Sequence, residues 1–172
     1  MELSFKKCNQ DNLKELRQLS ISTFSRAFKE QNNPEDFESY LAHAFSQEQL
    51  LMEIKNPHSS FFFTKLENTV VGYLKINRAS AQTELQEASG LELERIYVSE
   101  NYQNRGIGGR MLSFAEALAK EEGKTYLWLG VWEQNTMAIT FYERNGYKKF
   151  GKHPYYIGTD KQTDWLLKKE IQ

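Results

Sequence analysis

The chain has 172 residues, of which 40% are hydrophobic and 26% charged, a balance typical of a globular domain rather than a disordered segment. Its 22 basic and 23 acidic residues leave a formal net charge of -1, so no overall positive field favours nucleic acid, and we expect no direct nucleic-acid partner. Cys8 is the single cysteine, which excludes an intramolecular disulfide and a CxxC metal site.

The first residues of the chain carry no apolar core of the kind found in signal peptides. The apolar runs are far shorter than the ~20 residues that a membrane-spanning helix needs, so we expect a cytoplasmic protein without a membrane partner. No repeat and no linker rich in proline or glycine divides the sequence, which predicts one domain over residues 1–172. The oligomeric state stays open, with a homodimer among the alternatives.

The first half of the chain predicts a strand, a group of helices and a hairpin. Asp11 is placed to cap the first helix, and Pro34 suits the first turn of the second. Glu67 and Asn68 form the expected turn of the hairpin. In chain order, the periodicity predicts a strand at 3–7, helices at 13–24, 34–45 and 46–54, and strands at 60–66 and 70–77.

The second half predicts a strand, a loop, a helix and another strand in succession, an order that favours two parallel strands. Residues 91–98 alternate, which predicts that Leu91, Leu93, Arg95 and Tyr97 share one face and Glu92, Glu94, Ile96 and Val98 the other. The remaining predicted elements are a helix from Gly106 to Gly123, a strand at 126–131, a short helix from 135 or 136 to about 144, and strands at 147–150 and 163–170.

A glycine-rich loop connects the strand at 91–98 to the helix that follows it. Three glycines in four positions let the backbone approach a ligand closely, and the first amides of a helix lack internal partners. Arg105 and Arg110 add positive charge, so the segment predicts a phosphate or pyrophosphate site. Gly109-Arg110-Met111 lacks the Lys and Ser/Thr of a Walker loop, and Met111 occupies the place of the third glycine in a dinucleotide fingerprint.

Gln103, Gly106 and Gly108 instead resemble the Q/R-x-x-G-x-G/A loop of the GNAT acetyltransferases. Residues 93–98 and 135–147 resemble two further segments of that family, in the family's order. The resemblance implies a single-domain α/β (α+β) GNAT fold. In that fold a central mixed, mostly antiparallel twisted sheet is splayed between its two central parallel strands and flanked by helices. It also implies acetyl-CoA as the co-substrate and no metal.

A closer resemblance, to the PaiA-like spermidine/spermine N-acetyltransferases, rests on residues 37–54, 72–75, 93–98 and 157–164. It implies that the backbone of Ile96, Tyr97 and Val98 pairs with the pantetheine arm, with the Tyr97 or Val98 amide polarising the thioester carbonyl. The cofactor contacts implied beyond that strand are Gln103, Asn104, Arg105, Gly106, Ile107, Gly108, Gly109, Arg110, Asn135, Ala138 and Tyr142. Helix capping alone would also explain Asn135.

Acetyl transfer to an amine needs a neutral amine, so a proton acceptor is required near the thioester. Glu94 is the candidate base, directly or through water, with Glu92 as the weaker candidate; a solvated strand face is the alternative for both. Tyr142 is the second catalytic candidate, because the resemblance implies that its hydroxyl lies near the departing thiolate. Aromatic packing is its alternative interpretation.

The acceptor side is expected to involve Glu92, Glu94, Trp132, His153 and Tyr155. The PaiA-like resemblance implies a small-molecule amine, most simply a polyamine, as the substrate, and carboxylates there would attract a polycation even without proton transfer. The three histidines are too scattered to predict a metal site. Two alternatives stay open at this point: a GNAT enzyme for a peptide or protein N-terminus or another small amine, and a non-catalytic module that senses acetyl-CoA.

Overall fold

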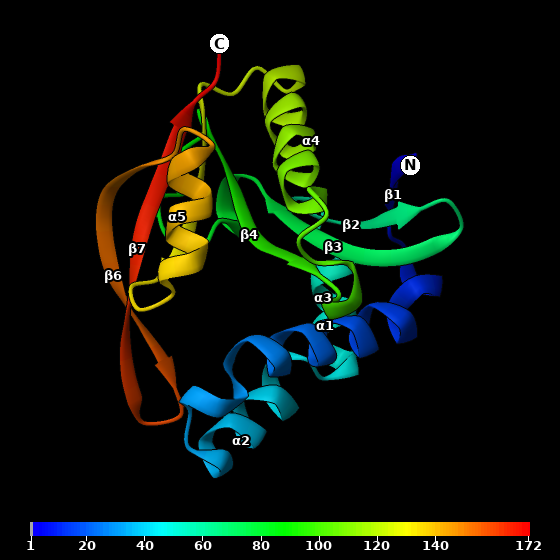
Figure 1. The fold of residues 1–172 in the computed structure, drawn as a ribbon, viewed down its shortest axis with the longest axis vertical. Helices are drawn as coiled ribbons and strands as arrows, with labels where there is room; N and C mark the ends of the chain where they lie inside the picture. The colour runs from blue at the N-terminus through cyan, green and yellow to red at the C-terminus, as the bar shows by residue number, and fades with distance from the viewer. Residues whose placement is uncertain (1) are drawn as a thin grey trace.

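The computed structural model describes residues 2–172 (Figure 1). Its helices are α1 (Leu13–Phe28), α2 (Pro34–Ala44), α3 (Gln47–Lys55), α4 (Ile107–Glu121) and α5 (Thr136–Arg144). Its strands are β1 (Leu3–Lys7), β2 (Ser59–Leu66), β3 (Thr69–Asn77), β4 (Gly90–Val98), β5 (Tyr126–Trp132), β6 (Lys148–Ile157) and β7 (Asp160–Glu170). Short 3-10 turns lie at Gln10–Asn12, Lys29–Gln31, Ala79–Ala81 and Glu100–Tyr102.

Within residues 2–172 the strands form a seven-stranded sheet in the order β1-β2-β3-β4-β5-β7-β6. The central pair, β4 and β5, runs parallel, and α4 makes the crossover between them. The neighbouring strand pairs are antiparallel, so the predicted mixed and mostly antiparallel sheet is confirmed. The single-domain α/β fold flanked by helices is confirmed with it.

Local capping explains where several helices begin. The Asn33 side chain accepts hydrogen bonds from the Glu35 and Asp36 amides at the start of α2, and Pro34 occupies the first turn as expected. The prediction that Asp11 caps the first helix was wrong. The Asn9 side chain instead accepts from the Asp11 amide and caps a 3-10 turn that leads into α1.

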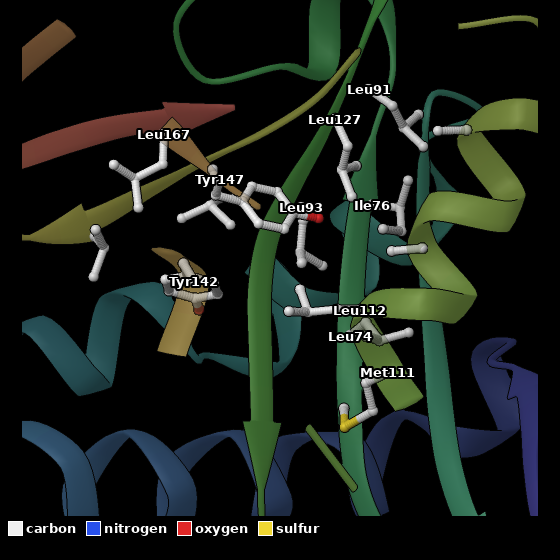
Figure 2. Close-up of a cluster of buried hydrophobic side chains, with 14 of the residues drawn as sticks. Leu74, Ile76, Leu91, Leu93, Met111, Leu112, Leu127, Tyr142, Tyr147 and Leu167 are labelled. Atoms are coloured by element: carbon white, nitrogen blue, oxygen red, sulfur yellow. The ribbon is translucent and has the colours of Figure 1, made fainter. Parts of the chain in front are cut away.

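The two larger hydrophobic cores lie on opposite faces of the sheet. The first packs α4 and α5 on strands β3, β4, β5 and β7, and its side chains gather between the sheet and these helices in Figure 2. The second packs α1, α2 and α3 on the other face, around buried residues such as Leu16, Phe37 and Leu50.

A β-bulge in β4 changes which residues share a face. Lys75 pairs with Arg95 while Ile76 pairs with Leu93, so Glu94 is an extra residue in the ladder. Beyond the bulge the faces exchange. Leu91 and Leu93 pack with Ile96 and Val98 on the α4 side. Arg95 and Tyr97 lie instead on the α1–α3 side, Arg95 near the Phe45 and Phe61 rings. The prediction of a regular alternation through residues 91–98 was therefore wrong.

The C-terminal hairpin is longer than predicted. β6 continues to Ile157 rather than ending near residue 150, and β7 begins at Asp160 rather than 163. β6 is an edge strand, and such a strand tolerates the lysines and the proline at 154 that weaken a strand pattern in the sequence. Ile157 is buried against the α1–α3 core, so the hairpin reaches across to α2.

Candidate active site

The two central strands part midway along their length. β4 and β5 pair only at Gly90–Tyr126, Leu91–Leu127 and Glu92–Trp128. Beyond those pairs β4 stays with β3 and β5 stays with β7. The backbone at Ile96, Tyr97 and Val98 therefore has β3 on one side and no ladder to β5 on the other, which is the splay that the family resemblance implies.

The glycine loop ends in an open helix N-terminus. Asn104 and Gly106 have positive φ angles of 60° and 75°, and Gly106 is the N-cap of α4 without a side-chain hydrogen bond to the first amides. Apart from the adjoining residues and the helix's own backbone, no atom lies within 4 Å of the place where a β-carbon on Gly106 or Gly109 would be, so no other described segment covers these two positions. Exposed donor amides and a helix dipole are the features that the predicted anion site requires.

The other loop residues support this arrangement. The Gln103 side chain donates to the Val98 carbonyl at 3.0 Å and ties the loop to the end of β4. The Arg105 guanidinium lies 5.2 Å from the centre of the Tyr102 ring. Arg110 is exposed in the first turn of α4, one turn beyond Gly106, and Ile107 is buried beneath it. The loop thus holds two arginines beside the exposed amides.

Helix α5 lies beside the first turn of α4, next to the gap between β4 and β5. A β-carbon on Gly108 would lie 3.3 Å from Phe141, so the glycine lets α5 approach the first turn of α4. Asn135 caps α5 by accepting from the Ala138 amide at 3.2 Å. A hollow of about 330 Å³ runs along α5 and is lined by Thr136, Met137, Thr140, Phe141, Arg144 and Asn145.

Tyr142 lies on the inner side of α5, where Figure 2 shows it with the core side chains of the sheet. It is 8% exposed and its ring meets the Tyr147 ring edge-on. Burial raises the pKa of the Tyr142 hydroxyl well above its usual value. A phenol is already protonated at neutral pH, and burial keeps this one protonated in basic solution as well, so it is able to donate a hydrogen bond.

The predicted base, Glu94, lies on the opposite face and belongs to a network of buried charges. It forms an ion pair with Lys75 at 2.5 Å and accepts from the Asn77 side chain at 2.8 Å. Glu53 on α3 forms ion pairs with the same lysine and with Arg95. Burial alone would raise the Glu94 pKa, but Arg95 and Lys75 more than offset it and lower that pKa below its usual range.

Glu92 has the opposite electrostatic character. It is buried and accepts from Asn77 at 2.9 Å and from the amide and hydroxyl of Thr83 at 2.9 and 2.5 Å. Desolvation, with Glu94 nearby, raises its pKa. Each of its oxygens is already engaged by these donors, so Glu92 holds the loop after β3 against β4.

The other predicted acceptor residues, Trp132, His153 and Tyr155, come from β5 and β6. The Tyr155 hydroxyl is hydrogen-bonded to that of Tyr40 on α2. Trp132 lies at the end of β5 with its ring edge-on to Phe28 of α1. His153 lies 3.3 Å from Glu84. The hairpin, β5 and the first two helices thus bring aromatic side chains to the α1–α3 side of the parted strands.

Sequence reasoning missed Glu53, Lys75, Asn77 and Tyr40 as parts of this region. Lys75 gave the one available signal, since a lysine inside a strand as apolar as residues 70–77 requires a buried partner. Among residues 2–172, no group of three or more His, Cys, Asp or Glu side chains is arranged to hold a metal ion. In the same part of the chain, no helix is both long and apolar enough to cross a membrane.

Comparisons with known proteins agree with this architecture. The acetyltransferase (GNAT) family profile matches residues 13–147. An uncharacterized N-acetyltransferase from the pepI 3′ region of Lactobacillus delbrueckii subsp. lactis is 40% identical over 163 residues, covering 95% of this chain and 94% of that protein. A spermidine N(1)-acetyltransferase of Thermoplasma acidophilum is 26% identical over 152 residues, covering 86% of this chain and 89% of that protein.

Among solved structures, the PaiA N-acetyltransferase from Thermoplasma acidophilum in complex with coenzyme A superposes with a TM-score of 0.79. It is 24% identical, and the match covers 99% of both chains. The parted strands, the open start of α4 and the family match lead to one conclusion: this chain belongs to the GNAT family and is an acetyl-CoA-dependent N-acetyltransferase.

Proposed function

We propose that the chain acetylates a primary amine of a polyamine, such as spermidine or spermine, by direct attack of the amine on acetyl-CoA in a ternary complex. The observation that carries the acceptor class is the match over 86% of the chain to a relative named as a spermidine N(1)-acetyltransferase. We further expect the enzyme to act in the cytoplasm, with a homodimer as the alternative to a monomer.

The donor side fits a coenzyme diphosphate. The free amides at the start of α4 and the guanidinium of Arg105 are suited to hold the phosphates. On the side that faces β5, the backbone N–H and C=O groups of residues 96–98 pair with no strand of the sheet. These groups are suited to hydrogen-bond the amides of a pantetheine arm. The hollow along α5 extends this surface beyond Asn135 and Ala138. Bound there, acetyl-CoA supplies the acetyl thioester.

The acceptor side suits a flexible cation with an apolar stem. Trp132 and Tyr155 provide aromatic faces against which methylenes and ammonium groups pack favourably. A second hollow of about 270 Å³ borders Trp132, and the carboxylates of Glu133 and Asp160 line it. These two acids are suited to bind the distal ammonium of a polyamine. His153 and Glu92 are assigned to the walls of the same acceptor site, further along the sheet.

We assign Tyr142 the role of hydrogen-bonding the thiolate as it leaves, which fits a phenol kept protonated by burial. Glu94 stays a predicted base, directly or through water. Its lowered pKa makes it a weak proton acceptor, so its charge is better suited to attract the ammonium than to deprotonate it. Lys75 and Arg95 also hold its side chain in one orientation.

Thiol release from acetyl-CoA over a panel of amines tests the proposal. The panel comprises putrescine, spermidine, spermine, amino sugars and peptides with a free N-terminus. We expect the highest kcat/KM for a polyamine. If peptides are acetylated and no polyamine is, the acceptor class is peptides rather than polyamines. If acetyl-CoA binds but no amine is acetylated, the protein is a sensor rather than an enzyme.

A further inference from the structure

Gly130 is an exposed position inside a strand that is otherwise buried. Its neighbours Leu129 and Val131 are buried in the α4–α5 core, and Trp128 is buried on the other face. Gly130 lies two residues beyond Trp128, where the pairing of β5 with β4 ends. Because side chains alternate along a strand, Gly130 leaves open the place between Trp128 and Trp132 on the α1–α3 side.

Asp164 of β7 borders this place. A β-carbon on Gly130 would lie 3.5 Å from the Asp164 Oδ2 atom. In the sheet Asp164 is the partner of Trp132 on one side and of His153 on the other. The half-buried carboxylate of Asp164 therefore lies beside Gly130, just beyond the point where the pairing of β4 with β5 ends.

Among residues 2–172, Asp164 differs from the buried carboxylates Glu53, Glu92 and Glu94 in having no hydrogen-bond or ion-pair partner. Glu53, Glu92 and Glu94 are each held by lysine, arginine, asparagine or threonine side chains. No hydrogen bond or ion pair within residues 2–172 engages the Asp164 oxygens, and neither oxygen is sealed from solvent. An unengaged carboxylate has its lone pairs available for an incoming donor.

The groups around Asp164 leave it available as an acceptor at neutral pH. Burial raises the pKa of Asp164 to about 6, and His153 opposes that rise only in part. His153 lies against Glu84, and the Tyr155 hydroxyl is engaged by Tyr40, so neither provides a fixed hydrogen bond to Asp164. A base is most effective when its pKa lies near the working pH, which the lowered pKa of Glu94 does not satisfy.

We propose that Asp164 binds the ammonium group of the acceptor in the place left open by Gly130 and takes the proton that makes the amine nucleophilic. This inference rests on the proposed function and names a residue for its first step. Gly130 is then a specificity position, because any side chain there would fill the place of the ammonium.

The proton and the bonds balance as follows. The ammonium gives one proton to the Asp164 carboxylate and becomes a neutral amine. The amine lone pair forms a bond to the carbonyl carbon of the acetyl group, and the carbon–sulfur bond breaks to release the thiolate of coenzyme A. The nitrogen then gives a second proton to the thiolate, and Asp164 returns its proton to water. The net products are the N-acetyl amine, coenzyme A thiol and one proton.

Asp164→Asn tests the proposal against Glu170→Gln, which removes a charge from the exposed far end of the same strand. We expect Asp164→Asn to lower kcat/KM for the best amine about 10²–10⁴-fold while the KM for acetyl-CoA changes little. The wild-type acid limb near pH 6 should disappear, and the residual rate should rise with pH as solvent deprotonates the amine. Glu170→Gln should behave as the wild type.

Thermal unfolding separates a catalytic role from a structural one. The folded-state pKa of Asp164 is raised, so ionisation of this carboxyl costs stability as the pH rises through about 6. Asparagine removes that cost, so Asp164→Asn should match or exceed the wild-type Tm at pH 8 even though turnover is lost. Gly130→Ala is the second variant, and it should raise the KM for the amine while acetyl-CoA affinity is kept.

The outcomes distinguish this inference from the proposed acceptor class. A kcat/KM for Asp164→Asn within threefold of the wild type, or an unchanged acid limb, overturns the role of Asp164 and leaves polyamine acetylation intact. If the best substrate is an amine other than a polyamine and its turnover depends on Asp164, the role of Asp164 stands and the proposed acceptor class is wrong. If no amine is turned over, calorimetric titration of spermidine into the coenzyme A complex decides, and unchanged binding in Asp164→Asn overturns the inference.

Discussion

Glu53→Gln should destabilise the protein because it unbalances a cluster of buried charges. The Glu53 Oε1 atom is the shared acceptor of Lys75 and Arg95, and the three side chains are only 13%, 6% and 15% exposed. The substitution keeps the size of the side chain but removes its charge. Lys75 and Arg95 are then left with Glu94 as the carboxylate between them.

The expected size of the effect follows from this geometry. Removing one partner of a buried ion pair costs about 3–5 kcal/mol, because the remaining charge stays desolvated. The amide oxygen of glutamine still accepts one hydrogen bond, so the lower end of that range, about 3 kcal/mol, is the better expectation. For a chain of this length that corresponds to a fall in Tm of about 6–12 °C.

Thermal unfolding followed by circular dichroism at pH 7 measures the change, with Glu48→Gln as the matched control. Glu48 is exposed on the same helix, so its variant should lose at most ~1 kcal/mol. Adding Lys75→Met to Glu53→Gln should recover part of the loss, because one of the two buried cations that then share Glu94 is removed. Equal Tm values for the two glutamine variants would refute the buried network as a source of stability.

Three further predictions concern the donor side and the core. Tyr142→Phe should lower kcat about 10–100-fold, the value of a hydrogen bond to a charged group, while a fluorescence titration shows unchanged acetyl-CoA affinity; loss of affinity instead would assign Tyr142 to binding. Gly108→Glu should weaken acetyl-CoA binding about 100-fold, since two like charges at an assumed separation of about 6 Å repel by about 2–3 kcal/mol at the effective dielectric of a protein surface. Gly108→Gln should do so less, and equal calorimetric dissociation constants for the two variants would contradict the charge argument. Burial raises the pKa of Cys8 to about 12, so at pH 8 a disulfide reagent should modify it about 10³-fold more slowly than in the unfolded chain, and rapid modification of the native protein would show the thiol to be accessible.

The parts of the fold that follow from local pattern were predictable. The helix after the glycine loop, the hairpin turn at Glu67 and Asn68, and the parallel crossover were each predicted by periodicity and turn residues, and the structure contains all three. The open start of α4 was predictable for the same reason, because Gly106 has no side chain with which to cap the helix. The family match then extends these local agreements to the whole fold.

What sequence could not supply depends on register and on contacts between distant residues. The bulge at Glu94 is visible only when β4 is laid against β3, and it moves Arg95 and Tyr97 to the face opposite the one their spacing predicts. Glu53 lies 41 positions before Glu94 in the chain, and only the packing of α3 on β2 brings them to the same lysine. Asp164 became a candidate only through its place beside Gly130.

Because the first turn of α4 has no side-chain cap, the stability of the folded protein should depend on the concentration of its anionic ligand in the cell. Donor amides that no side chain satisfies gain their partners when an anion arrives, so occupancy of that turn adds directly to the free energy of unfolding. At a free ligand concentration 100 times the Kd, the gain is about 2.7 kcal/mol. A cell well supplied with activated acetate would therefore keep more of this chain folded than a starved one, even before any amine is modified.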